Sequence, residues 1–173
     1  MRNNYYTLIT GASEGFGKAL ALECANRNMN LILVALPGSG LGNLAGYIEK
    51  NYSVHVFFFE HNLCSKEECY RIFDEVKEKG ITVNILINNA GMGGTHFFDE
   101  RDAEYYNRQI ELNVVAPTLL THLFLNTLEH NTPSYVLNVS SLAGLFSLPL
   151  KQVLRHKILS HLLFKKFAQG IKK

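Results

Sequence analysis

The hydrophobic and polar positions of this chain follow two alternating patterns, which predict strands and helices in turn. Short apolar runs, of which 30–35 (NLILVA) is the clearest, are typical of parallel strands covered on both faces. Stretches with apolar residues at helical spacing separate these runs. The predicted strands are 5–10, 30–35, 54–59, 83–88 and 134–140. The predicted helices are 15–28, 44–51, about 65–80, about 102–129 and 150–171.

Local signals support two of these helices. Ser65 followed three residues later by Glu68 is the pattern of a capping box, in which each side chain bonds the other residue's backbone N–H. Pro117 predicts a kink within the long helix, because proline removes one helical hydrogen bond. The segment 36–42 is predicted to be a loop, because proline and glycine interrupt any regular pattern there.

Repeated strand–helix units predict an α/β fold, a doubly wound parallel sheet of about five strands with helices on both faces. Ligands of such sheets bind outside the carboxyl ends of the strands. Polar and glycine-rich motifs follow three of the predicted strands, at 11–17, at 88–91 and at 140–141. We therefore expect these motifs to form one rim of a single domain that covers residues 1–150.

The segment 10–17 (TGASEGFG) carries the strongest chemical signal. It joins a strand to a helix, so its glycines allow a tight turn and a close approach of the backbone to a phosphate group. The helix that follows points its free N–H groups and its positive dipole end at the same place. The spacing G-x-x-x-G-x-G differs from the more usual G-x-G-x-x-G, and an ordinary glycine turn is the alternative interpretation.

Length and composition place the chain among globular proteins. A chain of 173 residues with 47% hydrophobic and 18% charged residues fits one domain with a sizeable core. No signal peptide or membrane-length apolar run is visible, so the cytoplasm is the expected location. Cys24, Cys64 and Cys69 show no metal-ligand spacing, so no metal site is predicted; free thiols are favoured over a Cys64–Cys69 pair.

Four motifs in the correct order resemble those of the short-chain dehydrogenase/reductases, over roughly residues 5–150. They are the glycine turn 10–17, the N-N-A-G segment 88–91, Asn113 within ELNVV, and the segment 138–144 (NVSSLAG). Asn62 and Leu63 stand where the family often has Asp-Leu beside the adenine, so one residue departs from the pattern.

The resemblance implies that residues 1–150 form a Rossmann-like dinucleotide-binding domain, with NAD or NADP as cofactor. It also implies hydride transfer to or from a small-molecule carbonyl or alcohol. By position, Ser141 would bind the substrate oxygen and Asn113 would hold a water of the proton relay. The resemblance also implies homodimer contacts through the long helix, and nothing in the pattern indicates a nucleic-acid partner. The cofactor-binding residues that it implies are Gly11, Ser13, Gly15, Phe16, Gly17, Asn62, Leu63, Asn89, Ala90 and Gly91.

The choice of cofactor stays open in the sequence. No acid follows the second predicted strand to bind the ribose hydroxyls of NAD, because Leu36 stands there. No base stands there for NADP either, and Glu14 in the glycine turn would repel a 2′-phosphate.

The family's catalytic tyrosine and lysine are absent at the positions where they are expected. Leu154 and Ile158 occupy those positions, and neither side chain can exchange a proton or carry a charge. His156 and His161 belong to no motif and are interpreted as part of a solvated helix face. The expectation is a dinucleotide-binding chain that is inactive in hydride transfer; a regulatory pseudoenzyme is the alternative.

The last 23 residues differ in charge from the rest of the chain. Residues 151–173 hold seven of the 17 Lys and Arg residues and none of the 15 Asp and Glu residues. Codons that fit 153–157, read one base later, encode Tyr-Ser-Asp-Ile-Lys, so a frame shift after Gln152 and a truncated family fold are predicted. Taken at face value, the segment is a basic amphipathic helix that covers the last strand or, less favoured, contacts a membrane or a partner.

Overall fold

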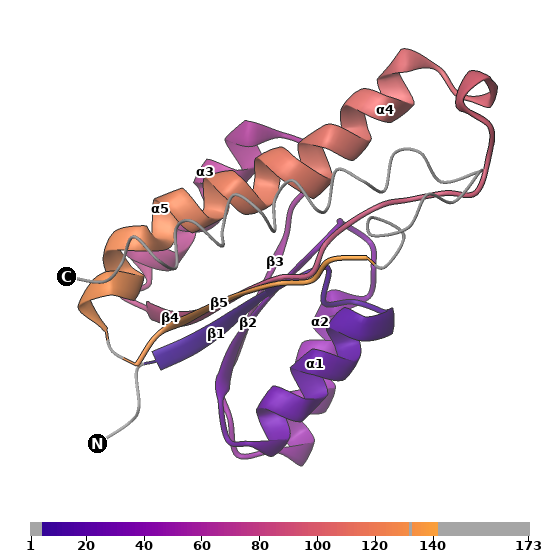
Figure 1. Cartoon of the computed structure of the whole chain (residues 1–173). Helices are drawn as coiled ribbons and strands as arrows, with labels where there is room; N and C mark the ends of the chain where they lie inside the picture. The colour runs from indigo at the N-terminus through magenta and orange to yellow at the C-terminus, as the bar shows by residue number, and fades with distance from the viewer. Residues whose placement is uncertain (1–4, 132, 142–173) are drawn as a thin grey trace.

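A computed structural model describes residues 5–131 and 133–141 of the chain, as a parallel sheet with helices on both faces (Figure 1). The five strands lie in the order β3-β2-β1-β4-β5, and every neighbouring pair is parallel. This order confirms the predicted doubly wound α/β fold. The strands are β1 (Tyr5–Thr10), β2 (Asn30–Ala35), β3 (Val56–Glu60), β4 (Thr82–Asn88) and β5 (Tyr135–Asn138).

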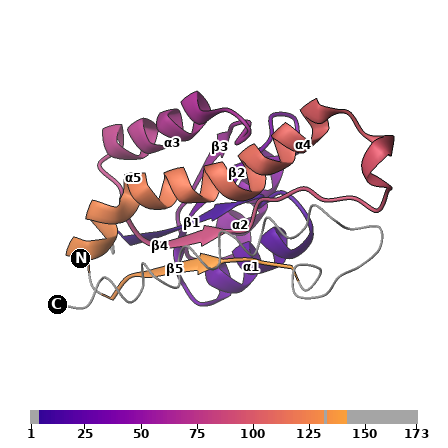
Figure 2. The ribbon, with the colours of Figure 1, turned by 45° about the horizontal axis from the view of Figure 1, so that its top comes forward.

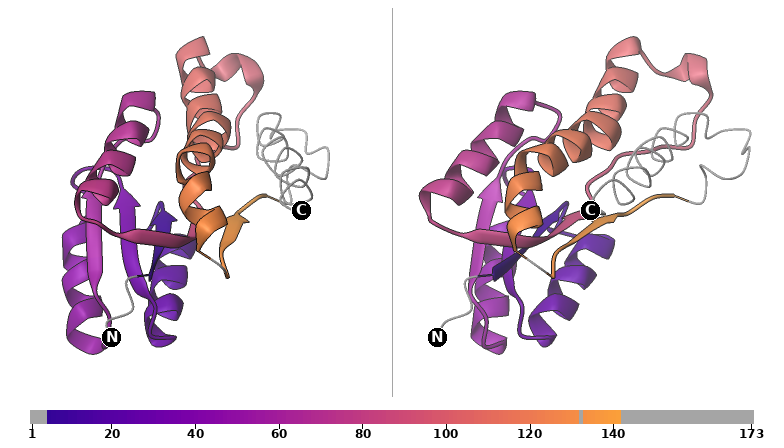
Figure 3. Two further views of the ribbon diagram at one scale, coloured as in Figure 1. Left: turned by 90° about the vertical axis from the view of Figure 1, so that its left-hand side faces the viewer. Right: turned by 60° about the vertical axis from the view of Figure 1, so that its left-hand side comes forward.

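Two helical layers enclose the sheet, with α1 and α2 on one face and α3, α4 and α5 on the other (Figures 1 and 3). The helices are α1 (Gly15–Asn26), α2 (Leu41–Asn51), α3 (Lys66–Glu78), α4 (Ala103–Ile110) and α5 (Ala116–His130). A short 3-10 helix, Phe98–Glu100, precedes α4. None of the described helices has the length and apolar character needed to cross a membrane.

Successive side chains of each strand point to opposite faces of the sheet, so the core forms two clusters. Leu8 and Val34 point to the face covered by α3 and α5, where they join Ile72 and Phe124. The next residues along each strand point to the other face, and Ile9 packs there with residues of α1 and α2. Because both faces are covered, the central strands are almost continuously apolar, as the sequence predicted.

The start of one helix and the capping of another differ from the prediction. Helix α2 begins at Leu41, three residues before its predicted start, because Gly40 adopts a left-handed backbone (φ 74°) and serves as its N-cap. At α3, Ser65 accepts a hydrogen bond from the Glu68 backbone at 3.3 Å, as predicted. The predicted return bond is wrong, since the Glu68 side chain pairs with other groups and the Ser65 N–H donates to Asn62 O.

The predicted long helix 102–129 is interrupted rather than continuous. A π-helical turn, Glu111–Val115, separates α4 from α5, and the two helices follow one another along the sheet in Figure 2. Pro117 lies directly after this turn, at the start of α5, which places the irregularity before the proline and not at it. A π turn inserts an extra residue into the helical spiral and is common at functional sites.

The remaining boundaries shift by a few residues. Helix α1 ends at Asn26 instead of Asn28, because Asn28 has a positive φ of 58°. Strand β3 is displaced to 56–60, and β5 is shorter than predicted. The predicted helix 150–171, the positions 154 and 158 and the proposed frame-shift point lie outside the described residues.

Candidate functional site

A cleft of about 740 Å³ opens at the carboxyl ends of the central strands. Residues from the turns after β1, β2, β3 and β4 line it, with α4 and the π turn on one side. Every residue that the sequence predicted for a cofactor lines this cleft: Gly11, Ser13, Gly15, Phe16, Gly17, Asn62, Leu63, Asn89, Ala90 and Gly91. The fold thus brings together three segments that lie far apart in the chain.

The N-terminus of α1 faces the cleft without a side-chain cap. Its N-cap residue, Glu14, has extended backbone and makes no capping hydrogen bond, and the first turn holds no acid. The first N–H groups of a helix have no partner within the helix, so they are available to an anion here. Helix α3 shows the contrast, because Ser65 caps it and Glu67 and Glu68 occupy its first turn.

The three glycines of the turn differ in the space around them: Gly11 and Gly17 are packed closely by the backbone and Asn89, and Gly15 is not. A Cβ on Gly17 would lie 2.0 Å from Gly11 O and 2.4 Å from Asn89 Nδ2, which no side chain tolerates. Gly11 has a φ of 64°, and a Cβ there would lie 2.9 Å from the Ala90 Cα. Gly15 has nothing within 4 Å of a Cβ, so the space above the helix start is free for a ligand.

Thr10 joins the turn after β1 to the segment after β4. Its buried Oγ1 accepts hydrogen bonds from Asn89 N and Ala90 N, both at 3.0 Å, and its hydroxyl faces Ile87 O at 3.4 Å. The Asn89 side chain returns the contact by donating to Thr10 O at 3.0 Å and to Gly11 O at 3.1 Å. These bonds fix the two walls of the cleft relative to each other.

Asn88 performs a similar role toward β5. Its buried side-chain amide donates to Thr121 Oγ1 of α5 at 3.1 Å and to Asn138 Oδ1 of β5 at 2.9 Å. The first asparagine of the N-N-A-G segment therefore supports the sheet edge, and the second supports the glycine turn.

Asn113 is buried in the π turn and binds the backbone of the cleft wall. Its Oδ1 accepts from Met92 N at 3.0 Å and its Nδ2 donates to Met92 O at 2.8 Å. Met92 itself lines the cleft, whereas Asn113 does not. The side chain thus acts as a two-bond clamp on the segment after β4, a structural contact that the sequence did not predict.

His61 anchors the end of β3 to α3. Its Nδ1 lies 2.5 Å from Glu68 Oε2 and its Nε2 lies 3.1 Å from Glu75 Oε1, and its side chain is only 11% exposed. Arg71 pairs with the other oxygen of Glu68 at 2.6 Å. Because His61 lines the cleft, this network holds the wall on the β3 side.

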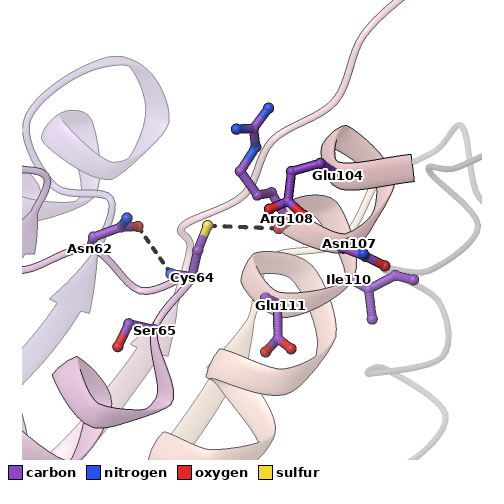
Figure 4. Close-up of a pocket in the computed structure, with 8 residues that line it drawn as sticks. All are labelled: Asn62, Cys64, Ser65, Glu104, Asn107, Arg108, Ile110 and Glu111. Atoms are coloured by element: carbon purple, nitrogen blue, oxygen red, sulfur yellow. Dashed lines mark hydrogen bonds between the residues drawn. The ribbon is translucent and has the colours of Figure 1, made fainter. Parts of the chain in front are cut away.

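A second pocket of about 580 Å³ adjoins the cleft on the α4 side (Figure 4). Asn62, Cys64 and Arg108 line both. The Cys64 thiol lies 3.7 Å from Arg108 O, and desolvation by burial raises the pKa of this thiol. Cys24, Cys64 and Cys69 are all free thiols, as the sequence predicted.

The two residues predicted to take part in catalysis lie apart from the cleft lining. Ser141 comes three residues after the end of β5, and Asn113 lies beneath Met92. Six residues that line the cleft were not among the predicted cofactor-binding residues: Leu36, Ser39, His61, Cys64, Arg108 and Leu112. The first four follow strands, where a polar residue is a signal for a ligand site. Arg108 of α4 and Leu112 of the π turn carry no such signal.

A parallel sheet with a glycine turn, a free helix N-terminus and a cleft at the strand ends defines a nucleotide-binding α/β protein. Comparison with protein families gives the narrower class: the family model described as short chain dehydrogenase matches residues 6–153. The chain belongs to this family.

Similar proteins include two from vertebrates. A very-long-chain 3-oxoacyl-CoA reductase of Anas platyrhynchos is 28% identical over 151 residues, which cover 84% of this chain and 47% of that protein. The 17-beta-hydroxysteroid dehydrogenase type 3 of Homo sapiens is 30% identical, with the same two coverages. The chain spans about half the length of the curated relatives it matches.

Solved structures show the same fold. A short-chain dehydrogenase from Sphingobium yanoikuyae in complex with NADPH is 27% identical, with a TM-score of 0.88, over 96% of this chain and 65% of that one. The bulky-bulky ketone specific alcohol dehydrogenase from Comamonas testosteroni is 26% identical, with a TM-score of 0.88, over 96% of this chain and 67% of that one.

Proposed function

We propose that this chain binds a nicotinamide dinucleotide, NAD or NADP, in the cleft at the strand ends. The observation that carries the proposal is the convergence of the three turns on one cleft, beside a helix start that no side chain caps. The pyrophosphate would lie against the backbone N–H groups of Gly15, Phe16 and Gly17. The relative solved with NADPH supports a dinucleotide as the ligand class.

The residues around the ribose position favour neither cofactor. Leu36 and Ser39 line the cleft beyond β2, where an acid would select NAD. Glu14 also lines the cleft, and its carboxylate opposes a 2′-phosphate. Both cofactors therefore belong in any binding test.

The chemistry of the family is hydride transfer between the nicotinamide ring and a carbonyl or hydroxyl carbon, and the cofactor supplies that step when it is bound. The names of the relatives point to ketone and alcohol substrates. We propose that Ser141 binds the substrate oxygen and that Asn113 keeps the segment after β4 in place. Leu154 and Ile158 offer no proton donor, so the chain binds cofactor but does not turn over substrate.

A shift of reading frame after Gln152 accounts for the missing tyrosine and lysine. The family match ends at residue 153, one residue beyond the proposed point. The nucleotide sequence tests this directly: a single-base edit should restore Tyr-Ser-Asp-Ile-Lys from position 153 onward. The proposal fails if no such edit restores both residues in frame.

The test of binding is a titration of the full chain with NADH and with NADPH, followed by the fluorescence of the reduced nicotinamide. Saturable binding of at least one cofactor is expected, and Ser141→Ala should bind it equally well. Turnover with a panel of ketones should stay at background. A folded chain that binds neither cofactor contradicts the proposal, and turnover at enzymatic rates contradicts the claim of inactivity.

A further inference from the structure

An exposed aromatic surface lies on the segment between β4 and α4. The segment extends beyond the sheet, carries the short 3-10 helix Phe98–Glu100 and turns back into α4 (Figures 1 and 2). Phe97 and Phe98 are each 60% exposed, and Ile110 of α4 is 38% exposed. We call Phe97, Phe98, Tyr106 and Ile110 the aromatic patch. A group of exposed apolar side chains marks an interaction site more often than a single one does.

Hydrogen bonds and ring contacts order this patch before any partner binds. The rings of Phe98 and Tyr106 are stacked, with their centroids 4.6 Å apart and an interplanar angle of 20°. The Tyr106 hydroxyl donates to Phe98 O at 2.7 Å, and the Tyr105 ring lies edge-on to the Tyr106 ring at 5.5 Å. A surface that is already ordered loses little conformational entropy when a partner covers it.

Carboxylates flank the aromatic patch. Between residues 97 and 104 the chain carries four acids and a single base, Arg101. Two of the acids bind neutral backbone donors: Glu100 accepts from Phe97 N at 2.9 Å, and Asp102 accepts from Tyr105 N at 2.8 Å. Within the described part of the chain none of the four has an ion pair: Asp99, Glu100, Asp102 and Glu104. An apolar surface with a negative rim fits a basic amphipathic partner.

The last residues of the same chain have the complementary composition. Residues 151–173 hold seven Lys and Arg residues and no acid. Apolar residues recur there at the spacing of one helix face: Leu150, Leu154, Ile158 and Leu162. This segment lies outside the described residues. The exposed strand β5 is a competing place for it, but residues 134–141 carry no charged side chain that could pair with the seven bases.

The topology brings this segment within reach of the aromatic patch. Strands β4 and β5 are parallel neighbours, and Asn88 pairs with Asn138 at their carboxyl ends. Phe97 comes nine residues after Asn88, and Leu150 comes twelve residues after Asn138. An extended chain spans about 3.3 Å per residue, so the two segments can cover about 30 Å and about 40 Å from the same edge of the sheet.

We propose that residues 150–171 dock on the aromatic patch of their own chain, with the apolar row against Phe97 and Phe98 and the basic residues beside the carboxylates. The apolar contact removes the two exposed rings from water. The opposite charges orient the segment and exclude the uncharged strand β5 as its place. This inference does not depend on cofactor binding.

A photo-crosslinker on the patch of the full chain tests the contact. Benzoylphenylalanine takes the place of Phe97, which makes no ring contact with the described residues, so the Phe98–Tyr106 stack stays in place. After irradiation, mass spectrometry of the digested monomer identifies the attached segment. The matched control carries the same group in place of Tyr47, which is 53% exposed on α2, on the other face of the sheet. Position 110 serves as a second reporter if circular dichroism shows that the first variant is unfolded.

Crosslinks from position 97 should lie mainly within residues 150–173 of the same chain, and crosslinks from position 47 should not. Asp99→Lys should lower the yield from position 97 at least about twofold, because it reverses one charge beside the patch. Glu78→Lys makes the same change at an exposed position of α3 and should leave the yield unchanged. Crosslinks only to other segments, crosslinks only between two copies, no crosslink, or equal yields in the two charge variants would each overturn the inference.

Discussion

Strands β1 and β5 both end near the cleft, but they lie in different surroundings. The last five residues of β1 are buried between β2 and β4, under helices on both faces. Among the described strands β5 pairs with β4 alone, and its Tyr135 and Leu137 are 61% and 47% exposed. The turn after β1 is therefore held by a buried strand. Ser141 follows a strand whose side chains are largely exposed among the described residues.

This difference separates the two halves of the proposed function. Phosphate binding depends on buried close packing at the glycine turn and on the bonds of Thr10 and Asn89. Substitutions there should lower both the stability of the fold and the affinity for cofactor. Ser141 is only partly buried, so its substitution should cost less free energy of unfolding than a substitution in the buried glycine turn.

The largest expected effect is that of Gly17→Ala. A Cβ at this position overlaps the Gly11 carbonyl and the Asn89 amide, which are themselves fixed by hydrogen bonds. We expect a loss of about 3 kcal/mol or more in the free energy of unfolding in urea, together with loss of cofactor binding. Gly46→Ala in α2 is the control, because a Cβ there meets no atom within 4 Å and should stabilise the helix by about 0.5–1 kcal/mol. Equal free energies of unfolding for the two variants would contradict the close packing at Gly17.

Thr10→Val should give the next largest effect. Valine has nearly the same shape but removes the Oγ1 that accepts from Asn89 N and Ala90 N. Asn89 N keeps Ile87 O as an acceptor at 3.1 Å, whereas the bond of Ala90 N is lost. We expect a cost of about 2–3 kcal/mol, measured by thermal or urea unfolding. Thr7 lies on the same strand and is equally buried, but its Oγ1 has no partner among the described residues. Thr7→Val should therefore be neutral or stabilising, and a cost equal to that of Thr10→Val would contradict the role of Thr10.

Asn113→Asp tests the clamp on Met92. Aspartate keeps the acceptor for Met92 N but places a carboxylate oxygen against Met92 O, where the native amide donates. The free energy of unfolding should fall by about 2 kcal/mol, and cofactor affinity should fall with it because Met92 lines the cleft. The same exchange at the exposed Asn107 of α4 should cost less than about 0.5 kcal/mol. Similar losses of free energy of unfolding in both variants would contradict a stabilising role for the two Asn113–Met92 hydrogen bonds.

The smallest effect concerns Cys69, a buried residue of α3. Desolvation by burial raises the pKa of this thiol to about 11, above its ordinary value of 9.0. The folded chain holds the proton more tightly than the unfolded chain, so its stability should fall as pH rises from about 9 to about 11. Unfolding at pH 8 and pH 11 should show a decrease on the order of 1 kcal/mol larger in the wild type than in Cys69→Ala. An equal pH dependence in both proteins would contradict this assignment.

The sequence was sufficient for the sheet and for the glycine turn after β1, because both depend on local pattern. A continuous apolar run such as 30–35 is typical of a buried parallel strand, and glycines between a strand and a helix are typical of a tight turn. The π turn at 111–115 was missed, since inserting one residue into a helix changes the direction of side chains without interrupting the apolar period. Thr10, His61 and Arg108 contribute through contacts with distant segments, and no pattern in one sequence reveals such contacts.

A crystal structure of the full chain with NADPH, or with NADH if only that binds, tests the central claim most directly. The account predicts the pyrophosphate against the N–H groups of Gly15–Gly17, the base beside Asn62, and the nicotinamide on the side of Ser141. A dinucleotide bound elsewhere, or in the cleft with its pyrophosphate away from the start of α1, would contradict it.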